Sequence, residues 1–116
     1  MSTYEMNIEQ KYLLNIKEGL KLHEYRLANQ KRLAINIGDI IHFISNQNKN
    51  FTLDVTVTNK RIYKSWEEVC DKVEHCLQDF KDVYSTKKEI ILACSKFYTP
   101  QDVIKYGIIV FDIKLN

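Results

Sequence analysis

A lysine, a glutamate and an arginine follow one another closely in the first third of the chain, as Lys21, Glu24 and Arg26. An arginine guanidinium binds a phosphate or a carbonyl edge through two hydrogen bonds at once, and a lysine ammonium neutralises a phosphate. A lysine that is removed from water also gives up its proton more readily and can then act as a general base or nucleophile. The three residues therefore predict either a site for a phosphate or a base edge, or a small hydrolytic centre.

These residues lie at the start of a predicted strand over 23–27, where side chains alternate between the two faces. The alternation places Glu24 and Arg26 on one face, and Lys21 with His23 and Tyr25 on the other. Glu24 would then orient Arg26 or accept a hydrogen bond from an exocyclic amine. A purely structural alternative is an internal Glu24–Arg26 ion pair that braces the fold, with Lys21 in solvent.

Other basic and aromatic residues are candidates to extend this site. With 17 basic and 15 acidic residues, the net charge of +2 does not by itself indicate a nucleic-acid-binding protein. Local clustering is more informative, and it suggests four rim contacts to a ligand: Arg32, Lys60, Arg61 and Lys64. Tyr25, Tyr63 and Tyr98 can stack on bases, although packing is the commoner role of such tyrosines.

The spacing of apolar residues predicts the elements that position these side chains. Strands are expected over 4–8, 23–27, 40–44, 51–57 and 109–115, a helix over 9–18 capped by Asn7, and a polar turn over 28–32. Capping boxes at 65–68 and 86–89 begin two more helices, and a short one follows from 99. This order lacks the strand–helix alternation and the glycine-rich loop of doubly wound nucleotide folds. It predicts an α+β fold, a small, mixed, mostly antiparallel β-barrel with helices packed at its ends.

The chain of 116 residues is expected to form a single domain, 1–116. Cys70, Cys76 and Cys94 are odd in number and form no CxxC pair, so we expect reduced thiols and a cytoplasmic protein. His75 lies between two of them, but positions six apart on a helix face different sides, so we expect neither a metal nor a cofactor. The longest apolar run, 108–111, is far shorter than the roughly 20 residues that cross a bilayer, so no membrane partner is expected.

Three segments together resemble the ASCH domain, a member of the PUA-like superfamily of small β-barrels. IKEGLKLHEYRL at 16–27 resembles the family's G-x-K-x-x-E-x-R signature, and IGDIIHF at 37–43 is similar to its G-D-x-I-x-F strand entry. KYGIIVFDI at 105–113 is similar to the closing strand of the family, and SWEE at 65–68 to a helix start that ASCH proteins often carry. The resemblance spans most of the chain and implies a small PUA-like barrel.

The resemblance implies RNA or a nucleotide-like ligand as the partner, bound in a basic cleft at the G-x-K-x-x-E-x-R motif. It also implies a second class, a small hydrolase similar to N4-acylcytidine amidohydrolases or to a ribonuclease, with Lys21 as base or nucleophile and Glu24 as proton shuttle. That enzymatic branch has a catalytic Thr where this chain has Glu24, and Leu22 replaces a Thr common in the family. The third catalytic residue has three candidates, Glu67, Glu68 and Glu74. A protein-interaction module is a third possibility.

Overall fold

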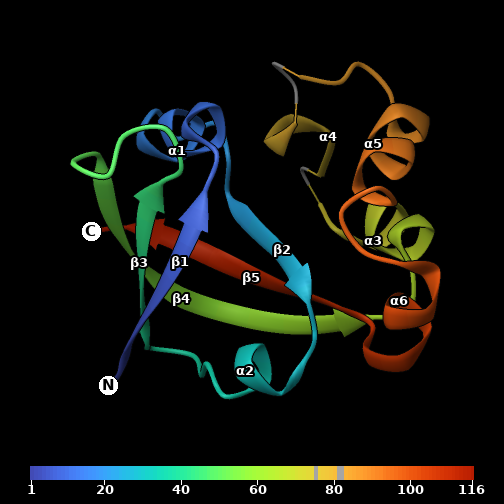
Figure 1. Ribbon diagram of the computed structural model, residues 1–116, viewed down its shortest axis with the longest axis horizontal. Helices are drawn as coiled ribbons and strands as arrows, with labels where there is room; N and C mark the ends of the chain where they lie inside the picture. The colour runs from blue at the N-terminus through green and yellow to red at the C-terminus, as the bar shows by residue number, and fades with distance from the viewer. Residues whose placement is uncertain (75, 81–82) are drawn as a thin grey trace.

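The computed structural model describes residues 1–74, 76–80 and 83–116. Within these residues, five strands form one curled sheet, and six helices pack around it (Figure 1). The strands are β1 (Thr3–Ile8), β2 (His23–Leu27), β3 (Ile40–Ser45), β4 (Thr52–Tyr63) and β5 (Ile108–Leu115). The helices are α1 (Gln10–Lys17), α2 (Gln30–Leu33), α3 (Trp66–Lys72), α4 (Cys76–Asp79), α5 (Lys87–Cys94) and α6 (Pro100–Tyr106).

The five strands form one mixed sheet in the order β1-β3-β4-β5-β2. β1 pairs with β3 in parallel, and the other three pairings are antiparallel. The sheet curls into a half-barrel that stays open between its two edge strands, β1 and β2, because these strands do not pair with each other (Figure 1). The predicted α+β class and the mixed, mostly antiparallel sheet are confirmed.

The core lies inside the curl of the sheet and beneath the helices. Val55 and Val57 on β4 are fully buried, as the alternation over 51–57 predicts. On β5 the alternation fails, because all four residues of 108–111 are fully buried. β5 lies between β4 and β2 in the sheet, and both of its faces are covered along this stretch.

Helix starts follow the predicted capping signals in most places. The Ser65 and Thr86 hydroxyls accept hydrogen bonds from the backbone N–H groups of Glu68 and Glu89, and Thr99 caps α6 in the same way. The predicted Asn7 cap is wrong: Asn7 stays in β1, and α1 begins after Glu9 without a side-chain cap. The predicted turn over 28–32 overlaps helix α2, which the Asn29 side chain caps and which extends to Leu33.

The cysteines lie closer together than the helical spacing predicted. Helix α3 ends at Lys72 and α4 begins at Cys76, so Cys70 and Cys76 do not share one helix, and their Sγ atoms are 3.8 Å apart. His75 lies outside the described residues. Within the described part of the chain, no three His, Cys, Asp or Glu side chains gather as a metal site, and no helix has the length and apolarity to cross a membrane.

Candidate functional site

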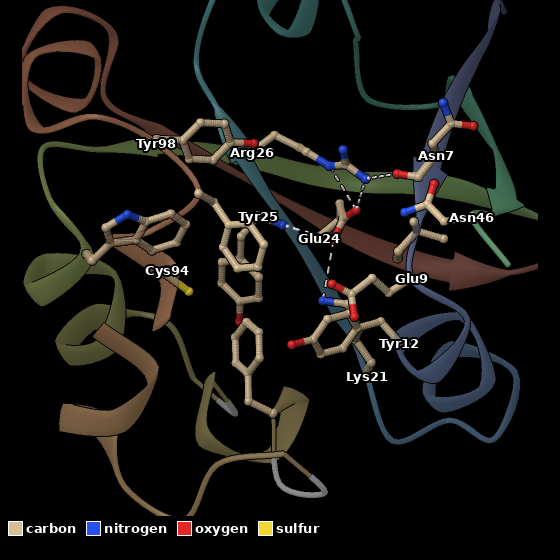
Figure 2. Close-up of a pocket in the computed structure, with 14 residues that line it drawn as sticks. Asn7, Glu9, Tyr12, Lys21, Glu24, Tyr25, Arg26, Asn46, Cys94 and Tyr98 are labelled. Atoms are coloured by element: carbon tan, nitrogen blue, oxygen red, sulfur yellow. Dashed lines mark hydrogen bonds and ion pairs between the residues drawn. The ribbon is translucent and has the colours of Figure 1, made fainter. Parts of the chain in front are cut away.

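A cavity of about 240 Å³ opens between the two edge strands of the half-barrel, where β1 ends and β2 begins (Figure 2). One part of its lining is aromatic: Tyr12, Tyr25, Trp66, Phe80, Phe97 and Tyr98. The other part is polar: Asn7, Glu9, Lys21, Glu24, Arg26 and Asn46. The predicted residues Lys21, Glu24, Tyr25 and Arg26 therefore meet at one cavity.

Glu24 is the centre of the polar wall. Its Oε2 accepts from Arg26 Nε at 3.0 Å and Nη2 at 2.8 Å, and its Oε1 lies 3.4 Å from Lys21 Nζ. Arg26 Nη2 also donates to the Asn7 carbonyl at 2.8 Å, so the arginine bridges β2 to β1 where the sheet stays open (Figure 2). The Glu24–Arg26 pair thus braces the open side of the half-barrel and lines the cavity at the same time.

Lys21 differs from both predictions made for it. It is only 4% exposed, so it is not solvated, and its ammonium donates to the His23 carbonyl. β2 begins at His23, so strand alternation does not govern Lys21, whose ammonium reaches Glu24 instead. The same ammonium lies 4.9 Å from the centre of the Tyr25 ring and 5.3 Å from that of Phe80. Ring faces and one carboxylate together stabilise this buried cation.

The charge of Glu24 is set by opposing influences. Burial alone raises the pKa of its carboxyl, but the charges of Arg26 and then Lys21, together with the hydrogen bonds from Arg26 and the Tyr25 N–H, hold the pKa below its ordinary value. Glu24 is therefore a carboxylate throughout the neutral range. Arg26 occupies Oε2, whereas the contacts of Oε1 with the Tyr25 N–H at 3.3 Å and with Lys21 Nζ at 3.4 Å are longer, so Oε1 is the Glu24 oxygen that keeps capacity to accept from a ligand.

Tyr25 is anchored from the helical side by Asp79, which the sequence analysis did not single out. The Tyr25 hydroxyl donates to Asp79 Oδ2, and the carboxylate, which has no exposed surface, also accepts from the Leu22 N–H at 2.6 Å. Burial and the Asp79 charge raise the pKa of Tyr25 far above its ordinary value. The Tyr25 phenol is therefore neutral at physiological pH, and its ring forms part of the cavity wall.

The four predicted rim cations do not line the cavity. Lys60 Nζ donates to the carbonyls of Leu33 and Ile35, and Arg61 pairs with Asp112 at 2.6 Å. Lys64 is exposed at the end of β4, next to the start of α3. The pKa of Arg32 is lowered, first by burial of its side chain and then by the charge of nearby Arg26.

The aromatic wall was only partly predicted. Trp66, the first residue of α3, was not predicted as a site residue, and it stacks on Tyr98 with ring planes 10° apart and centres separated by 6.4 Å. Tyr63 is half-buried and is not part of the lining. Among the described residues that line the cavity, none of Glu67, Glu68 and Glu74 appears.

Cys94 also lines the cavity, and it is only 3% exposed. Burial, and then the nearby Cys76, raise the pKa of its thiol to about 12. A thiol with such a pKa carries almost no thiolate at neutral pH and is a poor nucleophile. Cys94 therefore acts as apolar lining.

The lowered pKa of Glu24 predicts a specific loss of stability in acid. At neutral pH the Glu24 carboxyl is ionised in both the folded and the unfolded chain, so its interactions with Arg26 and Lys21 contribute fully to the free energy of unfolding. Below about pH 4.3, the ordinary glutamate value, the unfolded chain takes up the proton first, and the contribution is lost as the pH falls through the lower, folded value. Urea unfolding should therefore show that wild type has a higher free energy of unfolding than Glu24→Gln, and that this difference decreases steadily as the pH is lowered.

The control is Glu5→Gln, the same chemical change at an exposed position of β1. We expect this variant to keep a small and nearly constant gap to wild type over the same pH range. A Glu24→Gln gap of equal size at neutral and acidic pH would contradict the electrostatic assignment.

Comparison with known proteins gives a consistent result along the whole chain. The family model of the ASCH domain matches residues 6–108. The crystal structure of a hypothetical protein, PH0355, is 30% identical, with both chains covered fully and a TM-score of 0.84. The solution structure of protein PF0455 from Pyrococcus furiosus is 29% identical over 97% of this chain and 96% of the other, with a TM-score of 0.75. An ASCH mutant protein from Zymomonas mobilis is 8% identical over 97% of this chain and 67% of its own, and its TM-score of 0.56 supports the fold alone. No curated protein matches the sequence significantly.

Proposed function

The chain belongs to the ASCH domain family, and on this premise we propose that it binds RNA or a nucleotide-like ligand by inserting a base into the cavity between β1 and β2. The observation that carries the proposal is a buried, ionised Glu24 inside a cavity whose other wall is aromatic. Stacking on rings holds any base, and a fixed carboxylate accepts a hydrogen bond from an amino or imino group on its edge.

The free donors of Arg26 and Lys21 favour a base edge over a phosphate. Arg26 uses its Nε and both Nη2 hydrogens on Glu24 and the Asn7 carbonyl, which leaves only the Nη1 hydrogens for a ligand. Its two-bonded fork, the geometry that selects phosphate, is therefore already occupied. The one excess positive charge among Lys21, Glu24 and Arg26 is enough to attract a polar acceptor such as a ring carbonyl.

The size of the cavity is compatible with one heterocycle and not with a longer stretch of strand. Drug-sized ligands occupy pockets of roughly 300–1,000 Å³, and this cavity of about 240 Å³ is smaller. Bound RNA would therefore contribute one unstacked base to the cavity and run over the surface on either side.

The hydrolase alternative receives less support from the same geometry. A proton shuttle works best with a pKa near the working pH, whereas the pKa of Glu24 is lowered. None of the three glutamates predicted for the third catalytic position is among the described lining residues, and the aligned Thr is Glu24. The other carboxylate in the lining, Glu9, lies before the motif in the sequence and pairs with Lys11. Binding is therefore the function that we put forward for this cavity.

Phe97 offers the cleanest test of base insertion, because it lines the cavity while its side chain is 59% exposed. We expect Phe97→Ala to weaken the binding of fluorescein-labelled single-stranded RNA by about five- to a hundred-fold, the range for the loss of one stacking ring. Fluorescence anisotropy at two salt concentrations measures this. A base-dominated site should show a shallow salt slope, about −0.7 for a single phosphate contact.

The matched control is Leu92→Ala, which removes an apolar side chain of 58% exposure that does not line the cavity. Its affinity should equal that of wild type. Equal affinities of all three proteins, or a steep salt slope that persists in Phe97→Ala, would contradict base insertion and indicate binding elsewhere on the surface.

A further inference from the structure

We propose that Asp79 is a positioning residue for this cavity, holding the start of β2 and the Tyr25 ring in the geometry that the ligand needs. The inference rests on the proposed function, because it explains how the same site is kept in order. It assigns a role to a wholly buried carboxylate that does not line the cavity but contacts Tyr25, which does.

Asp79 collects hydrogen bonds from three residues of one short segment. Its Oδ1 accepts from the Leu22 N–H at 2.6 Å, and its Oδ2 accepts from His23 Nδ1 at 2.8 Å and from the Tyr25 hydroxyl. These donors lie within the same six-residue segment, 21–26, as the cavity residues Lys21, Glu24 and Arg26. Because both groups belong to one short segment, holding the donors to Asp79 also holds the cavity residues in place.

The anchored Tyr25 ring transmits this order to the polar wall. Its centre lies 5.3 Å from that of Phe80, the residue next to Asp79, and 4.9 Å from the Lys21 ammonium. Because the hydroxyl is tied to Asp79, it is not available to a ligand, and the ring is the surface that Tyr25 contributes. Loss of the Asp79 charge would free the hydroxyl and let the ring rotate away from Lys21.

Asp112 provides a matched control for the charge of Asp79. It also faces His23, with Oδ1 3.5 Å from Nε2, but it otherwise contacts Arg61 and Thr58 of β4, which do not line the cavity. Asp112→Asn therefore perturbs the same histidine but leaves the hydrogen bonds from Leu22 and Tyr25 to Asp79 intact.

The test is a double-mutant cycle in affinity, using labelled single-stranded RNA as the probe at a temperature where circular dichroism shows every variant folded. Asp79→Asn should weaken binding by about tenfold, the equivalent of one charge-assisted hydrogen bond, and Tyr25→Phe by less. The double variant should bind no more weakly than Asp79→Asn, because both changes break the same link. Asp112→Asn should bind as wild type does. Wild-type affinity in Asp79→Asn, with only a lowered unfolding midpoint, would overturn the proposal.

A readout without ligand separates this inference from the proposed function. Cys94 lines the cavity, whereas Cys70 is buried and does not line it, so iodoacetamide alkylation of each, followed by peptide mass spectrometry, compares cavity order with global stability. Asp79→Asn should raise the Cys94 rate relative to the Cys70 rate, whereas a merely structural role raises both equally. If wild type binds no RNA, the proposed function fails, and the alkylation ratio still decides whether Asp79 positions the cavity.

Discussion

Replacing Glu24 with Gln lowers the free energy of unfolding by about 3–5 kcal/mol, the range expected when one partner of a buried ion pair is removed. The variant leaves the Lys21 ammonium and the Arg26 guanidinium in the half-barrel without their carboxylate. Lys21 suffers most, because it is buried and its remaining oxygen partner is a backbone carbonyl. Urea unfolding at neutral pH measures the loss.

The double variant Lys21→Met, Glu24→Gln is the control for this explanation. It removes one buried cation together with the carboxylate, so it should be more stable than Glu24→Gln alone. A loss below about 1 kcal/mol in Glu24→Gln, as for a surface pair, would contradict the assignment of Glu24 as the centre of the polar wall.

Gly107→Ala is expected to be nearly as damaging, although the residue lies outside the cavity. Gly107 joins α6 to β5 with φ of 79° and ψ of −176°, a conformation open essentially to glycine alone. An added Cβ would lie 2.7 Å from the Tyr63 carbonyl oxygen, and the Gly107 carbonyl accepts from the Ala28 N–H that follows β2. We expect a loss on the order of 3 kcal/mol, measured by thermal and urea unfolding.

Gly38→Ala separates backbone strain from the steric clash. Gly38 also has a positive φ, 93°, but an added Cβ meets no atom within 4 Å. It should cost about 1 kcal/mol, the usual penalty for an L side chain in this region. Equal losses in the two variants would show that the contact with Tyr63 does not matter.

Local signals in the sequence predicted most of the fold. The hydroxyl caps at Ser65 and Thr86 depend on residues three positions apart, and the strand at 51–57 on strict alternation, so both could be predicted without knowledge of the tertiary structure. The family resemblance implied a small barrel but no strand order, and the parallel pairing of β1 with β3 was not predicted because it has no local signature.

The site was harder to predict where it depends on contacts distant in the sequence. Asp79 accepts a hydrogen bond from Leu22, which lies 57 positions earlier in the sequence. The signal in the sequence was weak: an acidic residue three positions after Cys76 and next to Phe80, both of which are buried. Lys21 was predicted as a site residue, with a solvated side chain as the structural alternative, but its burial could not be predicted because it depends on rings brought from α1 and from the segment after α4. Lys60 and Arg61 were predicted as ligand contacts, but nearby carbonyls and Asp112 occupy their side chains.

Entry of a base into the cavity can be followed through the fluorescence of Trp66, which is the only tryptophan and lines the cavity. Wild-type protein and Phe97→Ala are titrated with the common ribonucleosides and with their monophosphates. We expect a saturable change in Trp66 emission for at least one base, similar with and without the phosphate, and weaker in Phe97→Ala. A response that requires the phosphate, or no saturable response to any nucleoside while RNA still binds, would contradict base insertion.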